Sequence, residues 1–452
     1  MNGKTYRMEH SDEAMSDEMD FFNIPPTVVS CENREKWYYS SKNPLNDNIM
    51  LFDVEIPSGF MLDTSKIMLL LRAKVVKGDG EDIPSMPTTS WTKADITEAE
   101  KTALYAADVY HENLLHSTMF KRVSVRIQDL TMDSCDYALQ TYVDLMFDFS
   151  PAANVMIDLM RGGRSTAKRD NASINASNTA YDSVGRMRSD ALIESREFEM
   201  RGPVAMDIFK QEKPLLGKTC VLIELERNSP EKVLNSIKPN ADFKLEITHC
   251  KLEVPVLRMR TDIEEANESM LQKRPALYPF EKSCIKKYYL TSGIYSYEIE
   301  DMWQNFIPSE LKVFMIPSAN YNGSYKLNFM KLVNNKVKSV GFKVDNTPMP
   351  GEAMSLKYGA DLHQSLLGDA VSAISMAYPE AQWSANYQFR LPVFVFDLRN
   401  TSSRNVLPLV RKGLSKLEVK FETPLAENCI LFVSAKFPAV MKLDSNRRVT
   451  LQ

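Results

Sequence analysis

The segment Phe120–Asp129, FKRVSVRIQD, alternates apolar and polar residues from Val123 to Gln128. Successive side chains of a β-strand point to opposite faces, so this pattern predicts a strand with one face in a core and the other in solvent. The expected core positions are Val123, Val125 and Ile127, and the expected solvent positions are Ser124, Arg126 and Gln128.

Strand patterns of two kinds recur along the chain. Alternation returns in residues 243–257 (FKLEITHCKLEVPVL), 311–317 (LKVFMIP) and 416–425 (KLEVKFETPL). Nearly continuous apolar runs, typical of strands covered on both faces, occupy residues 67–76, 219–226, 391–398 and 428–437. Many strands and few helical patterns predict an all-β protein built of sandwiches.

Helical signals are few and lie between the strands. Residues 97–100 (TEAE) fit a capping box, and Asp133 is a candidate N-cap for CDYALQTYVDLMF, in which Ala138, Tyr142 and Leu145 or Met146 share one face. Residues 161–183 are rich in Gly, Ser and Asn and predict an exposed loop. Its basic residues are interpreted as a solvated surface, with contact to a polyanion or a neighbouring subunit as the alternative.

The length and charge of the chain limit the number of domains and the class of protein that it can be. A chain of 452 residues exceeds what one hydrophobic core usually serves, so two or three domains are expected. With 55 basic and 59 acidic residues the net charge is −4, which disfavours a dedicated nucleic-acid coat. The polar start lacks a secretory signal pattern, and no apolar run approaches the length of a membrane helix, so we expect no membrane insertion.

The composition changes at two places along the chain. Residues 1–22 form an acidic arm, which we interpret as flexible and as a candidate docking segment for a partner. The charged, non-alternating stretch 259–282 separates two strand-rich halves. We therefore predict an arm (1–22), a first sandwich (23–258), a linker (259–282) and a second sandwich with a C-terminal tail (283–452).

The sequence predicts no catalytic, cofactor-binding or metal-binding residue. The six cysteines lie far apart, without a C-x-x-C pair, and are expected to be buried free thiols, with metal ligands or disulfides as the alternative. His111 and His116, in HENLLH, are spaced one residue too far for a helical zinc motif, so they would point about 140° apart on a helix. The glycines supply no nucleophile elbow, phosphate loop or dinucleotide fingerprint, and we predict no enzyme.

Several segments together resemble one family. DFFNIPPT (20–27), FDVEIPS (52–58), ENLLHSTMFKRVSVRIQD (112–129), ESREFEMRGPVAMDIFKQEKPLLGKTCVLIEL (194–225), VFMIPSANYNGSYKLNFMKL (313–332) and VSAKFPAVMKLDSNRRV (433–449) occur in the order found in the hexon-like major capsid proteins of Polinton (Maverick) elements and adintoviruses. The resemblance covers roughly residues 20–449. It rests on collinearity, since no single segment is a chemical signature.

The resemblance implies a double jelly roll, two eight-stranded sandwiches in one chain. It also implies a homotrimeric, pseudohexameric capsomer that tiles an icosahedral shell, with penton and minor capsid proteins as partners. It further implies location in the virion capsid, synthesis in the host cytoplasm and no direct sequence-specific nucleic-acid binding. The alternative is a β-sandwich module that binds a ligand or receptor without assembling.

The resemblance also implies a structure for residues 309–332, SELKVFMIPSANYNGSYKLNFMKL. LKVFMIPSA becomes a core strand of the second jelly roll, and Asn320–Ser324 becomes a turn in which Asn322 or Gly323 takes a positive φ. YKLNFMKL (325–332) is expected to continue into the next strand. An ordinary hairpin of any β-sandwich fits these local residues equally well.

Overall fold

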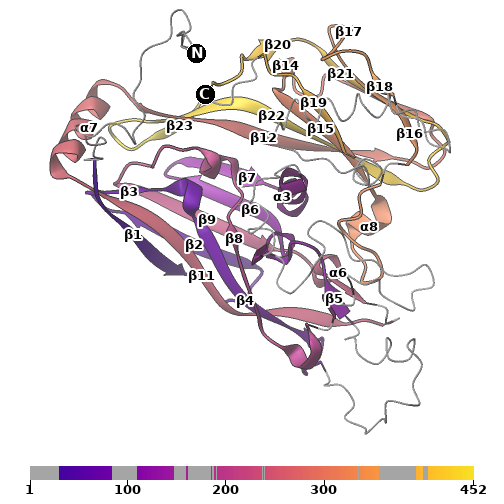
Figure 1. Ribbon diagram of the computed structural model, residues 1–452, viewed down its shortest axis with the longest axis horizontal. Coiled ribbons are helices and arrows are strands. Elements are labelled where there is room, and N and C mark those ends of the chain that lie inside the picture. The colour runs from indigo at the N-terminus through magenta and orange to yellow at the C-terminus, as the bar shows by residue number, and fades with distance from the viewer. Residues whose placement is uncertain are drawn as a thin grey trace, which may run out of the picture.

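The fold is seen in a computed structural model, which describes residues 30–83, 109–146, 191–236, 240–333, 335–355, 393–400 and 406–452, with the short pieces 159–160, 185, 188–189 and 238. Strands dominate these residues and lie in two stacked groups, one coloured indigo to rose and one salmon to yellow (Figure 1). None of the helices in the described part has the length and apolar character needed to cross a bilayer.

The first group of strands is a sandwich of two sheets. One sheet has the order β1-β11-β4-β8 and the other β2-β9-β6-β7, and β3 pairs with β11. The strands are β1 (Cys31–Ser40), β2 (Ile49–Ile56), β3 (Phe60–Leu62), β4 (Met68–Lys77), β5 (Val109–His111), β6 (Phe120–Ile127), β7 (Leu130–Ser134), β8 (Phe198–Pro203), β9 (Thr219–Arg227), β10 (Leu234–Ser236) and β11 (Phe243–Met259). β5 and β10 form a separate pair.

The second group repeats this arrangement. Its sheets have the orders β12-β22-β15-β19 and β13-β21-β16-β17; β18 pairs with β16, β23 with β22, and β14 with β20. The strands are β12 (Ala276–Leu290), β13 (Ser296–Glu300), β14 (Phe306–Ile307), β15 (Glu310–Pro317), β16 (Val337–Val344), β17 (Thr347–Pro348), β18 (Met354–Ser355), β19 (Val393–Asp397), β20 (Arg411–Lys412), β21 (Ser415–Phe421), β22 (Cys429–Leu443) and β23 (Val449–Leu451).

The two sandwiches share one topology. When the eight main strands of each are numbered along the chain, both sandwiches have the sheet orders 1-8-3-6 and 2-7-4-5. All the pairings are antiparallel, and the first and last strands lie side by side, as in a jelly roll. The protein is therefore a double jelly roll, as the family resemblance implies.

Helices are short and lie between strands. They are η1 (Thr64–Lys66), α2 (Leu115–Thr118), α3 (Tyr137–Met146), η2 (Ile193–Ser195), η3 (Asp207–Lys210), α6 (Pro230–Val233), α7 (Thr261–Lys273) and α8 (Ser318–Asn322). α7 has Asp262 and Glu264 in its first turn and Lys273 in its last, which complements the helix dipole. The expected linker 259–282 contains α7 and the first residues of β12.

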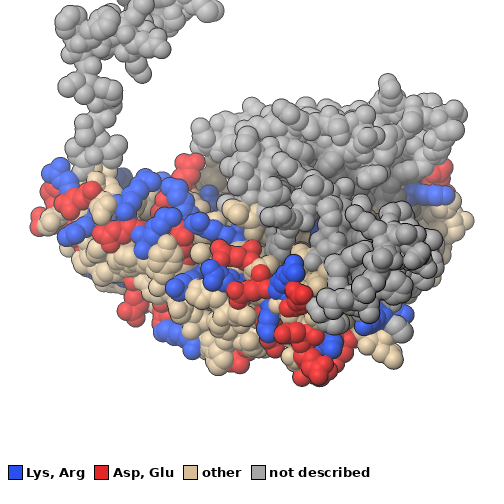
Figure 2. All heavy atoms as spheres, turned by 60° about the horizontal axis from the view of Figure 1, so that its bottom comes forward, with Lys and Arg blue, Asp and Glu red and all other residues tan. Residues whose placement is uncertain are grey.

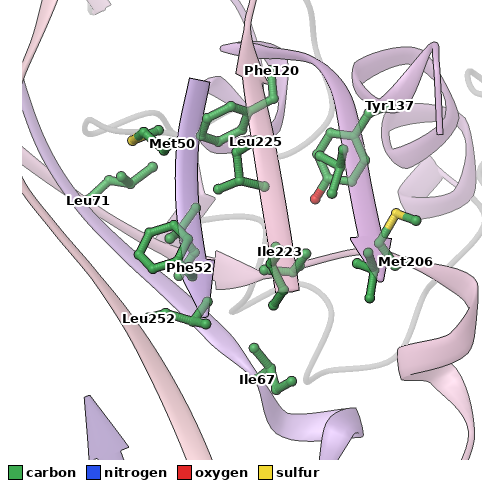
Figure 3. Close-up of a cluster of buried hydrophobic side chains, with 14 of the residues drawn as sticks. Met50, Phe52, Ile67, Leu71, Phe120, Tyr137, Met206, Ile223, Leu225 and Leu252 are labelled. Atoms are coloured by element: carbon green, nitrogen blue, oxygen red, sulfur yellow. The ribbon is translucent and has the colours of Figure 1, made fainter. Parts of the chain in front are cut away.

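The core of the first jelly roll fills the space between its two sheets. Phe52, Phe120, Ile223 and Leu252 are among its buried members, and Tyr137 at the start of α3 joins them (Figure 3). The cluster continues into the second jelly roll through the near ends of β12 and β22, which contribute residues such as Tyr278 and Met441. The 15-residue ladder from Ala276↔Leu443 to Leu290↔Cys429 therefore spans both cores.

β6 confirms the alternation that predicted it. Val123, Val125 and Ile127 are fully buried, and Arg126 is exposed. Ser124 is also buried, so its predicted solvent position is wrong. The strand predicted at 416–425 ends at Phe421.

The alternation in residues 311–317 predicted a strand with one exposed face. In β15, however, all eight residues are buried. Leu311, Val313 and Met315 enter the core of the second jelly roll. Phe314 and Ile316, on the other face, join a separate cluster with residues of the first jelly roll. The sheet β12-β22-β15-β19 is therefore covered on both faces.

Residues 325–332 do not form the predicted strand. Gly323 takes the predicted positive φ, 94°, but Ser318–Asn322 form the short helix α8, and the chain then continues through further turns to β16. The Tyr325 hydroxyl bonds the backbone of Phe243, and the Phe329 N–H donates to Glu112, both in the first jelly roll. These tertiary contacts outweigh the local strand pattern.

Two further predictions have mixed outcomes. The helix after Asp133 is confirmed as α3, but Asp133 belongs to β7 and pairs with Ser124, so it is not the cap. The six cysteines are free, as predicted, but only Cys250 and Cys429 are buried. Cys135 is exposed and the other three are partly exposed, so the prediction of burial is wrong for four of them. The capping box at 97–100 and the basic loop at 161–183 lie outside the described residues.

Candidate functional site: the seam between the two jelly rolls

The two jelly rolls meet at an apolar cluster, which we call the seam. α3 of the first jelly roll lies against the outer face of the sheet β12-β22-β15-β19. The buried members of the seam from the first jelly roll are Leu114, Ala138, Leu139, Tyr142, Val143 and Met160. Those from the second are Phe314, Ile316, Phe329, Met330, Val393, Val395, Ile430 and Phe432.

Aromatic rings fill the centre of the seam. The rings of Phe314 and Phe432 stack with centroids 5.1 Å apart, and Tyr321 of α8 lies 5.5 Å from Phe432 and 5.8 Å from Phe329. A buried aromatic side chain contributes roughly 2 kcal/mol by leaving water, and ring pairs add about 1 kcal/mol. These rings all belong to the second jelly roll, and Leu139, Tyr142 and Val143 of α3 pack in the same cluster. Separating the two jelly rolls would expose this apolar surface to water, so its burial favours the joined arrangement.

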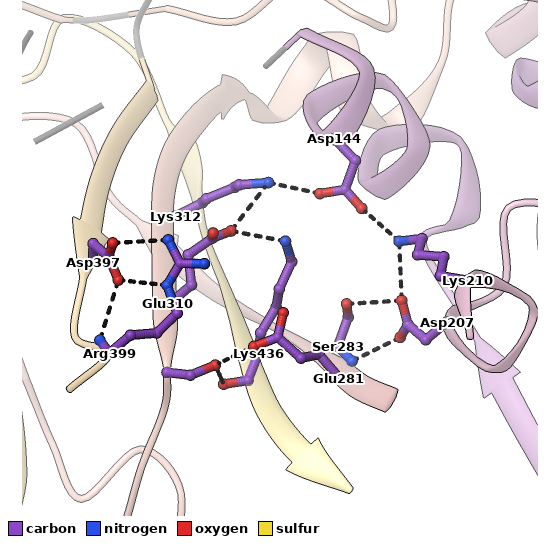
Figure 4. A network of polar contacts seen from close by, with 11 residues as sticks. Asp144, Asp207, Lys210, Glu281, Ser283, Glu310, Lys312, Asp397, Arg399 and Lys436 are labelled. Atoms are coloured by element: carbon purple, nitrogen blue, oxygen red, sulfur yellow. Dashed lines mark hydrogen bonds and ion pairs between the residues drawn. The ribbon is translucent and has the colours of Figure 1, made fainter. Parts of the chain in front are cut away.

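An ion network crosses one side of the seam (Figure 4). Asp144, near the end of α3, accepts from Lys312 of β15 at 2.7 Å and from Lys210 of η3 at 3.1 Å. Lys312 also lies 3.4 Å from Glu310, which pairs with Lys436 of β22 at 3.0 Å. Lys312 is only 2% exposed, so its ammonium depends on these two carboxylates.

The charges of this network stabilise one another. Burial alone raises the pKa of Asp144, but Lys312, Lys210 and Lys436 outweigh burial and hold that pKa well below its usual value. Burial alone lowers the pKa of Lys210, but the carboxylates of Asp144 and Asp207 raise it above its usual value. Both groups therefore stay charged at neutral pH.

Asp207 extends the network to the backbone of the second jelly roll. Its carboxylate accepts from the Ser283 N–H at 2.7 Å and from the Ser283 hydroxyl at 3.1 Å. Lys210, in the same short helix, bonds Asp207 at 3.1 Å, so the η3 segment is tied both to α3 and to β12.

A second polar group lies at the turn of α8. Asp136 accepts from the Tyr321 hydroxyl at 2.7 Å and pairs with Lys287 of β12 at 3.0 Å, while Lys287 donates to the Tyr321 oxygen at 2.9 Å. Burial lowers the pKa of Lys287, but its bonds to Tyr321 and Asp136 raise it overall. This triangle joins one residue of the first jelly roll to two of the second.

A third polar contact is fully buried. Glu112, which follows β5, accepts from Asn235 of β10 at 2.7 Å and from the backbone N–H of Phe329 at 3.0 Å. Burial raises the pKa of Glu112 to about 7, although Asn235, Arg188 and the backbone donors act in the opposite direction. This carboxyl therefore titrates near neutral pH within the seam.

The two histidines of HENLLH do not form a metal site. His111 lies in β5 with Nδ1 2.8 Å from the Glu112 carbonyl, and His116 lies in α2 with Nε2 3.0 Å from the Leu69 carbonyl. Burial lowers the pKa of His111 to about 3 and that of His116 to about 4. Within the described residues no group of three His, Cys, Asp or Glu side chains is placed to hold a metal ion.

One hollow of about 340 Å³ opens at the loop end of the first jelly roll. Its wall includes Asn46, Arg227 and Asn228, but their side chains already bond protein atoms. The wall is therefore built to hold the loops together, and it offers a ligand few free donors.

The geometry of the seam is suited to mechanical joining. Its apolar centre is bordered by three polar contacts, each of which pairs groups from both jelly rolls. The sequence did not identify these residues. The only local signal is Lys312, a cation in an otherwise apolar run, LKVFMIP.

Comparisons with known proteins agree with this architecture. No protein-family model matches the sequence, and no curated protein sequence is significantly similar to it. Among solved structures, a chain of the Sputnik virophage matches with TM-score 0.60 at 12% identity, over 100% of this chain and 94% of that one. A chain of the PBCV-1 virus capsid matches with TM-score 0.60 at 8% identity, over 95% and 99%.

The mavirus major capsid protein matches with TM-score 0.51 at 12% identity, over 100% of this chain and 97% of that chain. At such low identities the matches establish the fold. The protein has the double jelly-roll fold of these viral capsid chains, which confirms at the level of fold the resemblance inferred from the sequence.

Proposed function

We propose that this protein is a major capsid protein with a structural role and no catalytic one. Three copies would form a homotrimer in which six jelly rolls approximate a hexagon. Such trimers would tile an icosahedral shell through repeated lateral contacts. The protein would then reside in the virion capsid after synthesis in the host cytoplasm.

One observation carries this proposal: two jelly rolls of identical strand order are joined in one chain by a buried seam. A hexagonal block built from three chains requires two similar units at a fixed angle, and the seam supplies the fixed angle. The fold shared with the mavirus major capsid protein supports the same role.

The surface charge suits such a shell. On the face shown in Figure 2, basic and acidic side chains are interspersed over the described part. With a net charge of −4, the chain is not a polycation, so we infer that other proteins neutralise the genome. The expected partners are other copies of the chain, penton proteins and minor capsid proteins.

The finer assignment concerns the source of the protein. We infer a capsid protein of the kind found in Polinton (Maverick) elements and adintoviruses, because segments from residue 20 to residue 449 occur in the order of that family. Comparison of the strand-by-strand register with a solved capsid protein of that group would test this assignment.

The solution mass of the purified protein tests the assembly. Light scattering on a sizing column should give three times the 51.5 kDa of one chain, and the mass should persist at micromolar dilution. A stable monomer would contradict the proposed trimer and would favour the sandwich-type binding module instead.

A further inference from the structure

An exposed apolar surface lies at one end of the second jelly roll. We call it the Leu409 patch, and its members are between 40% and 64% exposed. They come from β14 and from the segment around β20, which pairs with β14 through Phe306↔Lys412. The patch consists of Phe306, Val406, Leu407, Leu409, Val410 and Leu414. A concentration of exposed aliphatic side chains of this kind marks an interaction site.

Two cations border the Leu409 patch. Arg411 donates to the Leu398 carbonyl, and the Lys412 ammonium lies 5.6 Å from the centre of the Phe306 ring. Neither has a carboxylate partner among the described residues. The nearby carboxylate of Asp345 instead accepts the Leu414 N–H at 2.8 Å. An occupant of the patch should therefore be apolar and acidic.

The N-terminal arm contains a segment with this composition. Residues 17–24 read DEMDFFNI, in which three carboxylates are followed by Phe21, Phe22 and Ile24. The basic residues that precede it, Lys4 and Arg7, lie ten or more positions upstream of Asp17. The segment can offer phenyl rings to the aliphatic patch and carboxylates to the two cations.

The start of the described chain and the Leu409 patch are both connected to β22. Cys31 pairs with Met259, which lines a small cavity together with Arg447 in the turn after β22. Lys436 lies seven residues before Leu443, the end of β22, which is about 24 Å along the strand. Its carbonyl accepts the Ser309 N–H, three residues along the chain from Phe306. Phe21 and Phe22 lie 10 and 9 residues before Cys31, so the extended chain carries their rings at most roughly 30 to 36 Å from Cys31.

We propose that residues 17–24 of this chain bind the Leu409 patch, with Phe21 and Phe22 on the aliphatic side chains and the carboxylates beside Arg411 and Lys412. The contact would cover the apolar surface and hold the acidic arm against the second jelly roll. The inference is independent of the proposed assembly.

Site-specific photo-crosslinking of the full-length protein tests the contact. The variant Leu409→benzoylphenylalanine should give, after irradiation and digestion, crosslinked peptides that contain residues 17–24. The matched control Tyr289→benzoylphenylalanine places the probe on a comparably exposed position of β12, away from the patch, and should not crosslink to the arm. Adding Phe21→Ser and Phe22→Ser should reduce the Leu409 crosslink at least about tenfold, because the two rings supply the apolar contact.

Three results would overturn the proposal. The first is no crosslink from position 409, and the second is a crosslink to another part of the protein, which would make the patch an interface between copies. The third is flotation of the unmodified protein with phosphatidylserine vesicles that is abolished by Leu409→Glu, which would assign the patch to lipid. Light scattering on the same samples separates this test from the test of assembly, since a trimer without the crosslink contradicts only the docking.

Discussion

Replacing Glu112 with glutamine should change the pH dependence of stability. Glu112 is fully buried at the seam, and burial raises its pKa from 4.5 to about 7. Below pH 4.5 the carboxyl is protonated in both the folded and the unfolded chain. Between pH 4.5 and 7 the unfolded chain releases the proton while the folded chain retains it, so the free energy of unfolding falls as the pH rises.

The size of the effect follows from the shift in pKa. Each pKa unit corresponds to about 1.4 kcal/mol, so wild-type protein should lose roughly 3 kcal/mol between pH 4.5 and pH 8 through this group. Glutamine is isosteric and does not titrate, and its carbonyl can still accept from Asn235 and from the Phe329 N–H. The variant should therefore gain stability relative to wild type as the pH rises.

Urea unfolding at pH 5 and pH 8, at one protein concentration, measures this difference. The free energy of unfolding of Glu112→Gln, minus that of wild type, should be more positive at pH 8 than at pH 5 by about 2–3 kcal/mol. The control Glu81→Gln removes an exposed carboxylate, 71% accessible, and should show the same difference at both pH values. If the free energy of unfolding of Glu112→Gln minus that of wild type were equal at both pH values, or less positive at pH 8, the raised pKa of Glu112 would be refuted.

Three further substitutions test the seam and the turn beside it. Lys312→Met removes the cation between Asp144 and Glu310 and should cost about 3 kcal/mol in urea unfolding, whereas Lys36→Met, at a lysine 57% exposed, should cost under about 1 kcal/mol. Phe432→Ala should destabilise by about 3–5 kcal/mol and increase proteolysis between the jelly rolls; unchanged proteolysis would argue against the seam as the joining element. Gly323→Ala should cost about 1–3 kcal/mol by thermal unfolding, because its φ of 94° disfavours a side chain and the new Cβ would lie 2.7 Å from the side chain of Lys232; an unchanged midpoint would contradict this.

The strands were predictable because their signal is local. The alternation in residues 120–127 depends only on neighbours in the sequence, and β6 forms where it indicates. The fold class could also be inferred, because two strand-rich halves and an ordered set of family-like segments are visible without knowledge of any contact.

Residues 325–332 show why local patterns fail elsewhere. Their apolar residues suggest a strand, but Phe329 belongs to the seam and Tyr325 bonds the backbone of β11. The seam itself was not predictable, because its partners are distant along the chain: Asp144 and Lys312 are 168 residues apart, and Glu112 and Phe329 are 217 apart. Nothing in one sequence pairs such residues.

Negative-stain electron microscopy of the purified oligomer tests the central claim most directly. Two jelly rolls joined rigidly by the seam, in a trimer, should give class averages with a hexagonal outline and threefold symmetry. Single particles with two lobes at variable angles would contradict both the rigid seam and the proposed capsomer.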